Sequence, residues 1–226
     1  SREHVLPKAA GNRGETAVHC FSSIARGWPR GQVYQDGMTQ ATLCARCNCL
    51  CGRHYVRPFA EWTRQAAEYR TRMNGDSEVL LPFTIVPLAV AKQIATITLA
   101  MSHAGSIDLG HYVALRRFVT APARSAGLGA FRFYAYFHCG EPVFEGPFAA
   151  VSTRGGPSPF LFCDVGREPL GYMVTASDAA SAQWAVRLRL CDLTNFSERP
   201  ANVISVEHLR LPCIRGRLPF GAPGAK

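Results

Sequence analysis

The stretch Ser1-Arg2-Glu3-His4-Val5-Leu6-Pro7-Lys8 decides the interpretation of this chain, together with Cys44-Ala45-Arg46-Cys47-Asn48 further along. The first stretch places an acid directly before a histidine, and an apolar pair and a proline follow. The second begins a segment with helical periodicity and carries two thiols and an amide. Carboxylate, imidazole, thiol and amide groups bind metal ions or transfer protons in proteins. The N-terminal part of the chain is therefore the candidate for a functional site.

The side chains of this region suit the hydrolysis of a phosphodiester. That reaction needs a deprotonated water in line with the leaving oxygen, and a cation to neutralise the charge that develops on the phosphate. His4 can act as the base, because a neutral imidazole titrates close to working pH. Glu3 and Asn48 offer the oxygen ligands that Mg²⁺ or Mn²⁺ prefers. Adjacent residues of a strand point to opposite faces, so Glu3 and His4 can serve one ion only if the hairpin is twisted or its loop folds over.

The two stretches resemble the motifs of the His-Asn-His (HNH) family of ββα-metal nucleases. The resemblance covers residues 2–59, a quarter of the chain, and rests on the acid–histidine doublet with its following proline and lysine, and on the Cys-x-x-Cys-Asn. It implies a strand–strand–helix module around one divalent ion. It further implies that His4 is the general base and that Glu3 and Asn48 are the metal ligands.

The chain departs from the family pattern at two places. The middle residue of the family name, often Asn, falls near Thr39 or Gln40, either of which would orient the base less well. Many HNH proteins also carry a Cys-x-x-Cys before the doublet, which joins the second pair in a structural Zn²⁺ site. Either a segment ahead of Ser1 supplies that pair, or the site is remade around Cys44 and Cys47. The further ligands would then come from His19, Cys20, Cys49 or Cys51.

The nine cysteines favour a reducing compartment. Their number is odd and no signal peptide is visible, which argues against a disulfide framework and predicts a cytoplasmic protein. In a helix that begins near Ala45, Cys47 and Cys51 share one face and Cys49 points elsewhere. We therefore expect Cys49 and Cys51 to be packing residues. Other cysteines lie in apolar runs and are expected to be buried thiols: Cys139, Cys163, Cys191 and Cys213.

The charge of the chain favours a polyanionic partner. The net charge is +9; residues 1–74 hold 11 basic and 5 acidic residues, whereas residues 75–226 hold 14 and 11. The excess lies where the candidate site is, as nucleic-acid binding requires. We expect Arg53, Arg57 and Lys8 to contact phosphate. Other arginines of the same helical segment are expected to form a solvated face: Arg64, Arg70 and Arg72.

The periodicity predicts an α+β protein with two parts. Residues 1–74 are expected to form the HNH-like ββα-metal module. Residues 75–226 are expected to form helices and an antiparallel β-sheet region that supports the module or selects its substrate, with a disordered tail at 216–226. The predicted helices of this part are 87–102 and 108–119, and the predicted strands are 131–137, 143–151, 160–164, 170–175, 184–190 and 203–211.

Within the module, local signals predict a strand, a hairpin and a helix. Residues 3–7 form the first strand, and segments 32–34 and 38–43 pair across the turn signal Asp36-Gly37. Residues 45–73 are helical, with a break at Pro58. The apolar face of this helix is Phe59, Trp62, Ala66 and Tyr69.

The apolar stretch 79–101 favours a buried helix over a membrane span, because Lys92 near its centre would be costly in lipid. No membrane partner is therefore expected. The combined prediction is a metal-dependent endonuclease that cuts DNA with a histidine-activated water and one divalent cation. Two alternatives stay open: a zinc-stabilised module that binds nucleic acid without cutting it, and an RNA-directed nuclease. The sequence leaves the target and the oligomeric state open.

Overall fold

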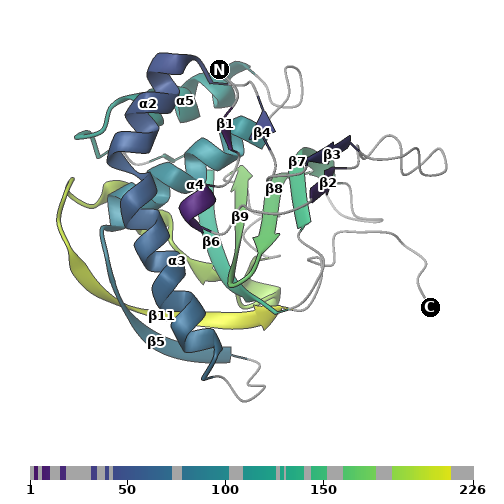
Figure 1. Ribbon diagram of the computed structural model, residues 1–226, viewed down its shortest axis with the longest axis vertical. Helices are drawn as coiled ribbons and strands as arrows, with labels where there is room; N and C mark the ends of the chain where they lie inside the picture. Colours follow the sequence, from purple (N-terminus) through teal and green to yellow (C-terminus); the bar gives the residue numbers. More distant parts are fainter. Residues whose placement is uncertain are drawn as a thin grey trace.

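The computed structural model shows an α+β protein in which helices cover a mixed β-sheet (Figure 1). This confirms the predicted class. The residues that it describes are 3–4, 7–10, 16–18, 32–34, 39–40, 43–72, 78–101, 109–125, 128–129, 131–139, 144–151, 160–176 and 185–214. The tail predicted at 216–226 lies outside them.

The described helices agree closely with the prediction. They are α2 (Ala45–His54), α3 (Val56–Arg70), α4 (Pro87–Met101) and α5 (Leu109–Thr120), with 3₁₀ turns η1 (Lys8–Ala10) and η2 (Thr194–Glu198). The break between α2 and α3 lies at Tyr55, so the prediction of a break at Pro58 is wrong. Pro58 is instead in the first turn of α3, where a backbone N–H is not needed for the helical hydrogen bonds.

The large sheet has the described strands β5 (Glu78–Ile85), β6 (Phe131–His138), β7 (Phe144–Val151), β8 (Phe160–Arg167), β9 (Leu170–Ala176), β10 (Cys191–Asp192) and β11 (Ser205–Ile214). Their order is β5-β11-β6-β9-β8-β7, and β10 also pairs with β6. Neighbouring strands are antiparallel except β11 and β6, which are parallel, with Cys213 opposite Phe137. The prediction of an antiparallel sheet is wrong at this pair, because β11 reaches β6 from a distant part of the chain and not through a hairpin.

The predicted strand at 184–190 is also wrong. Residues 185–187 are helical. Arg189 has a φ of 54°, which lies in the left-handed region and not in the strand region. The short strand β10 begins only after this turn.

Two small antiparallel pairs lie in the N-terminal part of the chain. β1 (Glu3–His4) pairs with β4 (Thr39–Gln40), and β2 (Thr16–Val18) pairs with β3 (Gln32–Tyr34). The predicted hairpin between segments 32–34 and 38–43 is therefore wrong, because each strand pairs with an earlier segment. A turn signal is local, whereas the pairing depends on strands further back in the chain.

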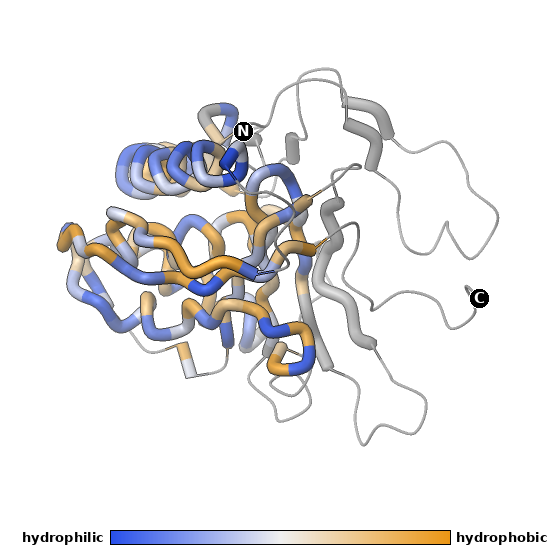
Figure 2. Tube along the Cα trace, turned by 90° about the horizontal axis from the view of Figure 1, so that it is seen from below, coloured by the Kyte–Doolittle hydropathy of each residue, from blue (hydrophilic) through white to orange (hydrophobic). Residues whose placement is uncertain are grey.

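The central helix α4 is buried on all sides. It packs against α2, α3 and α5 and against strands β7 and β9, as expected for a helix that is apolar all round. Seen from below, a helical layer lies over the strands (Figure 2). The predicted buried helix is confirmed for 87–101, whereas residues 79–85 belong to β5. Among the described residues, no helix has both the length and the apolar character needed to cross a membrane.

The helix α3 packs on the core through the predicted face. Phe59, Trp62 and Ala66 are fully buried. The rings of Phe59 and Trp62 lie against Tyr172 of β9, with centroid distances of 5.3 and 5.6 Å. These contacts join the helical segment after the Cys-x-x-Cys to the large sheet.

Side chains of α3 also close the outer edge of β5. Gln65 donates to the carbonyl of Thr84 at 2.8 Å and accepts from its N–H at 2.9 Å, and the Tyr69 hydroxyl donates to the carbonyl of Pro82 at 2.6 Å. An open edge would offer these backbone groups to another chain. The helix therefore both fixes and protects this strand.

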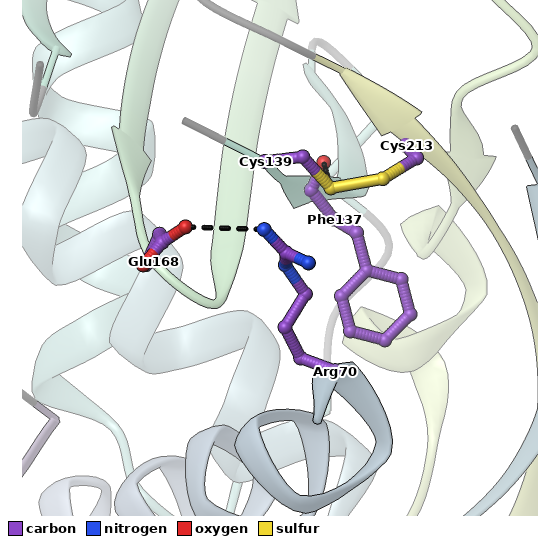
Figure 3. Close-up of a disulfide and its surroundings, with 5 residues drawn as sticks. All are labelled: Arg70, Phe137, Cys139, Glu168 and Cys213. Carbon is purple, nitrogen blue, oxygen red and sulfur yellow. Dashed lines mark hydrogen bonds and ion pairs between the residues drawn. A yellow bond between two sulfur atoms is a disulfide. The ribbon is translucent and has the colours of Figure 1, made fainter. Parts of the chain in front are cut away.

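A disulfide joins the ends of the parallel strands β6 and β11 (Figure 3). Cys139 and Cys213 are bonded, with Cα atoms 6.0 Å apart and a sequence separation of 74. The prediction that these two residues are free thiols is wrong. Nearby, Arg70 of α3 pairs with Glu168 between β8 and β9 at 3.3 Å. Covalent and ionic links thus tie together elements that are far apart in the sequence.

Candidate functional site at the start of helix α2

The acid–histidine doublet lies on a strand that pairs with the segment preceding α2. Glu3 is opposite Gln40, and His4 is opposite Thr39. The doublet therefore pairs with the two residues at which the HNH resemblance places its middle residue. Six residues lead from Thr39 to Ala45, the first residue of α2, and such a segment spans at most about 20 Å.

For β1 and β4, the structure describes the backbone only. The side chains of Glu3 and His4 lie outside the described residues, so their convergence with Asn48 on one cation stays a prediction. The pairing of β1 with β4, which directly precedes α2, is compatible with it.

The helix α2 begins at the predicted Cys-x-x-Cys. Cys44 is the N-cap residue, with extended backbone, and its sulfur accepts a hydrogen bond from the N–H of Cys47 at 3.4 Å. Its carbonyl accepts from the N–H of Asn48 at 2.9 Å. The cap satisfies one of the free N–H groups that every helix start leaves. Asn48 is half-buried in the first turn of α2, directly after Cys47 and one turn after Cys44.

The two thiols of this turn differ in acidity. The hydrogen bond from the Cys47 N–H, with that from the Cys47 thiol, lowers the pKa of Cys44, and the charge of Arg116 lowers it further. The same thiol contact, together with burial, raises the pKa of Cys47. The first proton is therefore lost from Cys44, which is exposed. A thiolate is the form of cysteine that binds metals and acts as a nucleophile.

The described residues would supply two of the four ligands of the predicted zinc site. Cys44 and Cys47 are two adjacent thiols, as a tetrahedral Zn²⁺ site would use. No group of three or more His, Cys, Asp or Glu side chains within the described parts of the chain could hold a metal ion. His19 and Cys20, two of the predicted further ligands, lie outside those parts. A zinc site here would need ligands from that remainder, or from a second chain.

The other cysteines of α2 have different surroundings. Cys51 is buried and accepts a hydrogen bond from the Thr96 hydroxyl at 3.6 Å, and burial raises the pKa of its thiol. The prediction that Cys51 is a packing residue is confirmed. Cys49 is exposed, so the same prediction is wrong for it.

The two remaining free cysteines lie in the large sheet. Cys163 is a buried free thiol, as predicted. Cys191 is half-buried rather than buried, and the loss of solvent around its sulfur raises its pKa to about 12. With its pKa raised so far, the Cys191 thiol stays protonated near neutral pH and does not compete with Cys44 as a ligand.

The predicted phosphate contacts are exposed. Arg53 lies in the last turn of α2, Arg57 in the first turn of α3, and Lys8 in η1. Of the arginines predicted to form a solvated face, Arg64 and Arg72 are exposed as predicted, whereas Arg70 is half-buried. Arg64 pairs with Glu61 at 2.6 Å and with Glu68. Arg70 pairs with Glu168, and Arg72 is exposed.

Sequence reasoning missed the contribution of α5. This helix packs beside α2, at the end of the molecule where β1 and β4 also lie (Figure 1). Its Arg116 is close enough for its charge to lower the pKa of both Cys44 and Cys47, although other effects dominate at each thiol. The pair Arg116-Arg117 is visible in the sequence, but nothing local indicates that it lies beside a helix some 70 positions earlier.

A second polar cluster is buried in the large sheet. The Tyr136 hydroxyl donates to Asp164 at 2.8 Å, and the ring of His138 lies 6.4 Å from that of Tyr136. A Cβ added to Gly171 would lie 2.0 Å from the Tyr136 ring, so only glycine leaves room for it. Burial, with the Asp164 charge adding to it, raises the pKa of Tyr136 well above its usual range. The phenol therefore stays protonated and acts as a structural donor.

Comparisons with protein-family models, with curated proteins and with solved structures found no match to this chain.

Proposed function

We propose that this protein is a metal-dependent endonuclease that hydrolyses phosphodiester bonds in DNA. The observation that carries the proposal is the pairing of the Glu3–His4 strand with the strand that leads into α2. Because β4 directly precedes α2, this pairing brings the backbone of the acid–histidine doublet towards the start of α2, where Asn48 and the two thiols lie. The resemblance to HNH nucleases and the basic charge of residues 1–74 support it.

Each residue has one role in this proposal. His4 takes the proton from the attacking water. Glu3 and Asn48 would hold one Mg²⁺ or Mn²⁺, which when bound neutralises the charge that develops on the phosphate. Arg53, Arg57 and Lys8 position the nucleic acid through its phosphates. Cys44 and Cys47 would hold a structural Zn²⁺ with ligands outside the described residues.

Plasmid nicking tests the proposal. The purified chain with Mg²⁺ or Mn²⁺ is expected to convert supercoiled plasmid to the open circle. His4→Ala is expected to slow this by about 100-fold or more, because it removes the general base. Asn48→Ala is expected to raise the metal concentration needed for half-maximal nicking, because it removes one ligand.

The matched control for His4→Ala is His208→Ala, because His208 is exposed on β11, in the large sheet. This variant is expected to nick like the wild type. Equal nicking by His4→Ala and the wild type would contradict the proposed role of His4. A wild type that nicks with neither metal would contradict the nuclease itself.

The alternative with an observation in its favour is a zinc-stabilised binding module without catalysis. The hydrogen-bonded thiols of Cys44 and Cys47 favour it. Metal analysis of the purified protein separates the two: about one equivalent of zinc without nicking favours the binding module. Digestion of matched duplex DNA and single-stranded RNA tests the RNA-directed nuclease.

A further inference from the structure

Two sets of arginines can be distinguished among the described residues. One set pairs with carboxylates, through Glu61, Glu68, Glu168, Asp192, Glu207 and Glu78; its members are Arg64, Arg70, Arg132, Arg199 and Arg210. The other set, on and around α2 and α5, has no ion pair within the described parts of the chain. Its members lie on α2, at the start of α3, on α5 and directly after α5: Arg46, Arg53, Arg57, Arg116, Arg117 and Arg124. Arg72 and Arg189 are also exposed without an ion pair among the described residues, but they lie away from this set, after α3 and before β10.

We call the second set the α2–α5 arginine surface. Segments 43–60 and 109–125, which carry it, contain no Asp or Glu. Acids flank both segments, because Glu61 directly follows the first and Asp108 directly precedes the second. The pKa of Glu61 is lowered mainly by Arg64 and only slightly by Arg57. Segments 43–60 and 109–125 therefore supply no negative charge to compensate that of their arginines.

Tertiary contacts hold the two helices of this surface together. The Tyr55 hydroxyl, between α2 and α3, donates to the carbonyl of Val119 in α5 at 2.7 Å. Lys92 of α4 donates to the carbonyls of Phe118 and Ala121 at 2.6 and 2.7 Å. Arg116 consequently lies near the thiols that begin α2, and Asn48 follows in the same turn. The position of α5 is set by buried groups and not by its arginines.

We infer that the α2–α5 arginine surface binds the phosphates of duplex DNA, and that α5 contributes Arg116 and Arg117 to it. The inference rests on the proposed function and extends it to a helix outside the HNH-like motifs. Guanidinium groups stay charged and bind phosphate oxygens in pairs. A ten-residue helix such as α2 is about 15 Å long, and one DNA strand presents a phosphate about every 3.4 Å of helix axis, so about four phosphates can pass along it.

The surface is less suited to a protein partner. In stable protein interfaces, arginines act beside large aromatic anchors in a well-packed centre. The exposed large apolar residues of the described chain lie elsewhere, on β5, near and on β11, and after residue 184: Leu80, Val186, Val203, Ile204 and Val206. The α2–α5 arginine surface offers charge without such anchors, as binding to a phosphate backbone requires.

Binding of a 30-base-pair duplex, followed by fluorescence anisotropy without added Mg²⁺ or Mn²⁺ over a range of salt concentrations, tests this inference without any cleavage. Because each lost phosphate contact lowers the slope of log K against log salt by about one, R116A/R117A is expected to lower it by about two. Its affinity at moderate salt is expected to fall by about tenfold or more. The control R199A/R210A removes two exposed arginines that pair with Glu207 and Glu78, and is expected to keep the wild-type slope.

The outcomes separate this inference from the nuclease proposal. A wild-type slope for R116A/R117A, with its thermal unfolding unchanged, would overturn the inference even if the wild type nicks plasmid. A lowered slope for R116A/R117A alone supports it even if no variant nicks. Tighter wild-type binding to single-stranded RNA of the same length would overturn the assignment to duplex DNA.

Discussion

Lys92 is a charged residue at the centre of the most buried helix of the molecule. It is fully buried, and its Nζ lies 4.2 Å from the ring centroid of Phe118. Its two carbonyl acceptors, on Phe118 and Ala121, belong to the end of α5, where a helix leaves carbonyls without partners of its own. Lys92 therefore caps α5 from the interior. One buried side chain thus sets the position of the helix that carries Arg116.

Burial makes the charge of Lys92 sensitive to pH. Desolvation lowers its pKa from an ordinary 10.5 to about 8. Below pH 8 the amine is charged in both the folded and the unfolded chain. Between pH 8 and 10.5 the unfolded chain binds more protons at this residue, so the free energy of unfolding rises with pH in that window. We expect the rise from this group to be about 3 kcal/mol at most.

Urea unfolding of the wild type and of Lys92→Met at pH 7, 9 and 10 measures this effect. Because thiols and phenols titrate in the same window, the quantity to follow is the difference between the two proteins at each pH. The stability of the wild type relative to Lys92→Met is expected to increase from pH 7 to pH 10. A difference that stays constant would show that Lys92 does not lose its proton in the folded protein.

At the scale of elements, the sequence predicts what local signals specify. Pro87 fixes the start of α4 because its ring suits the first helical position, and the predicted helix 87–102 is confirmed. The strand β5 was missed because 79–85 and α4 form one apolar run, and periodicity alone does not separate a short buried strand from a helix. The pairing of β3 with β2 was missed because it depends on a strand distant in the sequence.

The same distinction applies to the candidate site. The Cys-x-x-Cys-Asn motif predicted the start of α2, because a helix start is specified locally. The closeness of Arg116 to these thiols follows from the packing of α5 on α2, and no pattern in the sequence reports it. The disulfide between Cys139 and Cys213 was missed for the same reason.

That disulfide gives a prediction about the sheet. The link closes a long loop and joins β6 to β11 where the two strands run parallel without a hairpin. The disulfide restricts the unfolded chain. For a closed loop of this length, this restriction is expected to stabilise the fold by about 4 kcal/mol. The double variant C139S/C213S is therefore expected to lose about that free energy of unfolding in denaturant titrations.

A reductant supplies the control for this prediction. Dithiothreitol is expected to lower the melting temperature of the wild type towards that of C139S/C213S, and to leave C139S/C213S unchanged. The substitution Cys163→Ser, at a free buried thiol, is expected to leave the effect of the reductant in place. A wild type that melts identically with and without reductant would show that the link adds no stability.

At the scale of the whole molecule, one apolar core crosses residue 74, the boundary predicted between the two parts of the chain. Residues of η1, α2 and α3 belong to the same buried cluster as residues of β5, α4 and the sheet. Phe59 and Trp62 have no exposed surface, and Tyr172 and Phe83 are among the residues that cover them. The helix after the Cys-x-x-Cys is thus part of the core that the sheet completes.

We therefore expect a fragment of residues 1–74 to lack a cooperative fold by itself. Without β5, α4 and β9, the side chains of Phe59 and Trp62 would be open to water. Each would lose the stabilisation of about 2–3 kcal/mol that its burial contributes. Circular dichroism on heating should show no sigmoidal transition for the fragment and a sharp one for the full chain. The control is a mixture of the fragment with a second fragment of residues 75–226. A restored transition would show that the first fragment lacked its packing partner and was not disrupted by the break in the chain itself. A cooperative transition in the fragment alone would mean that the N-terminal elements form a core that does not depend on the large sheet.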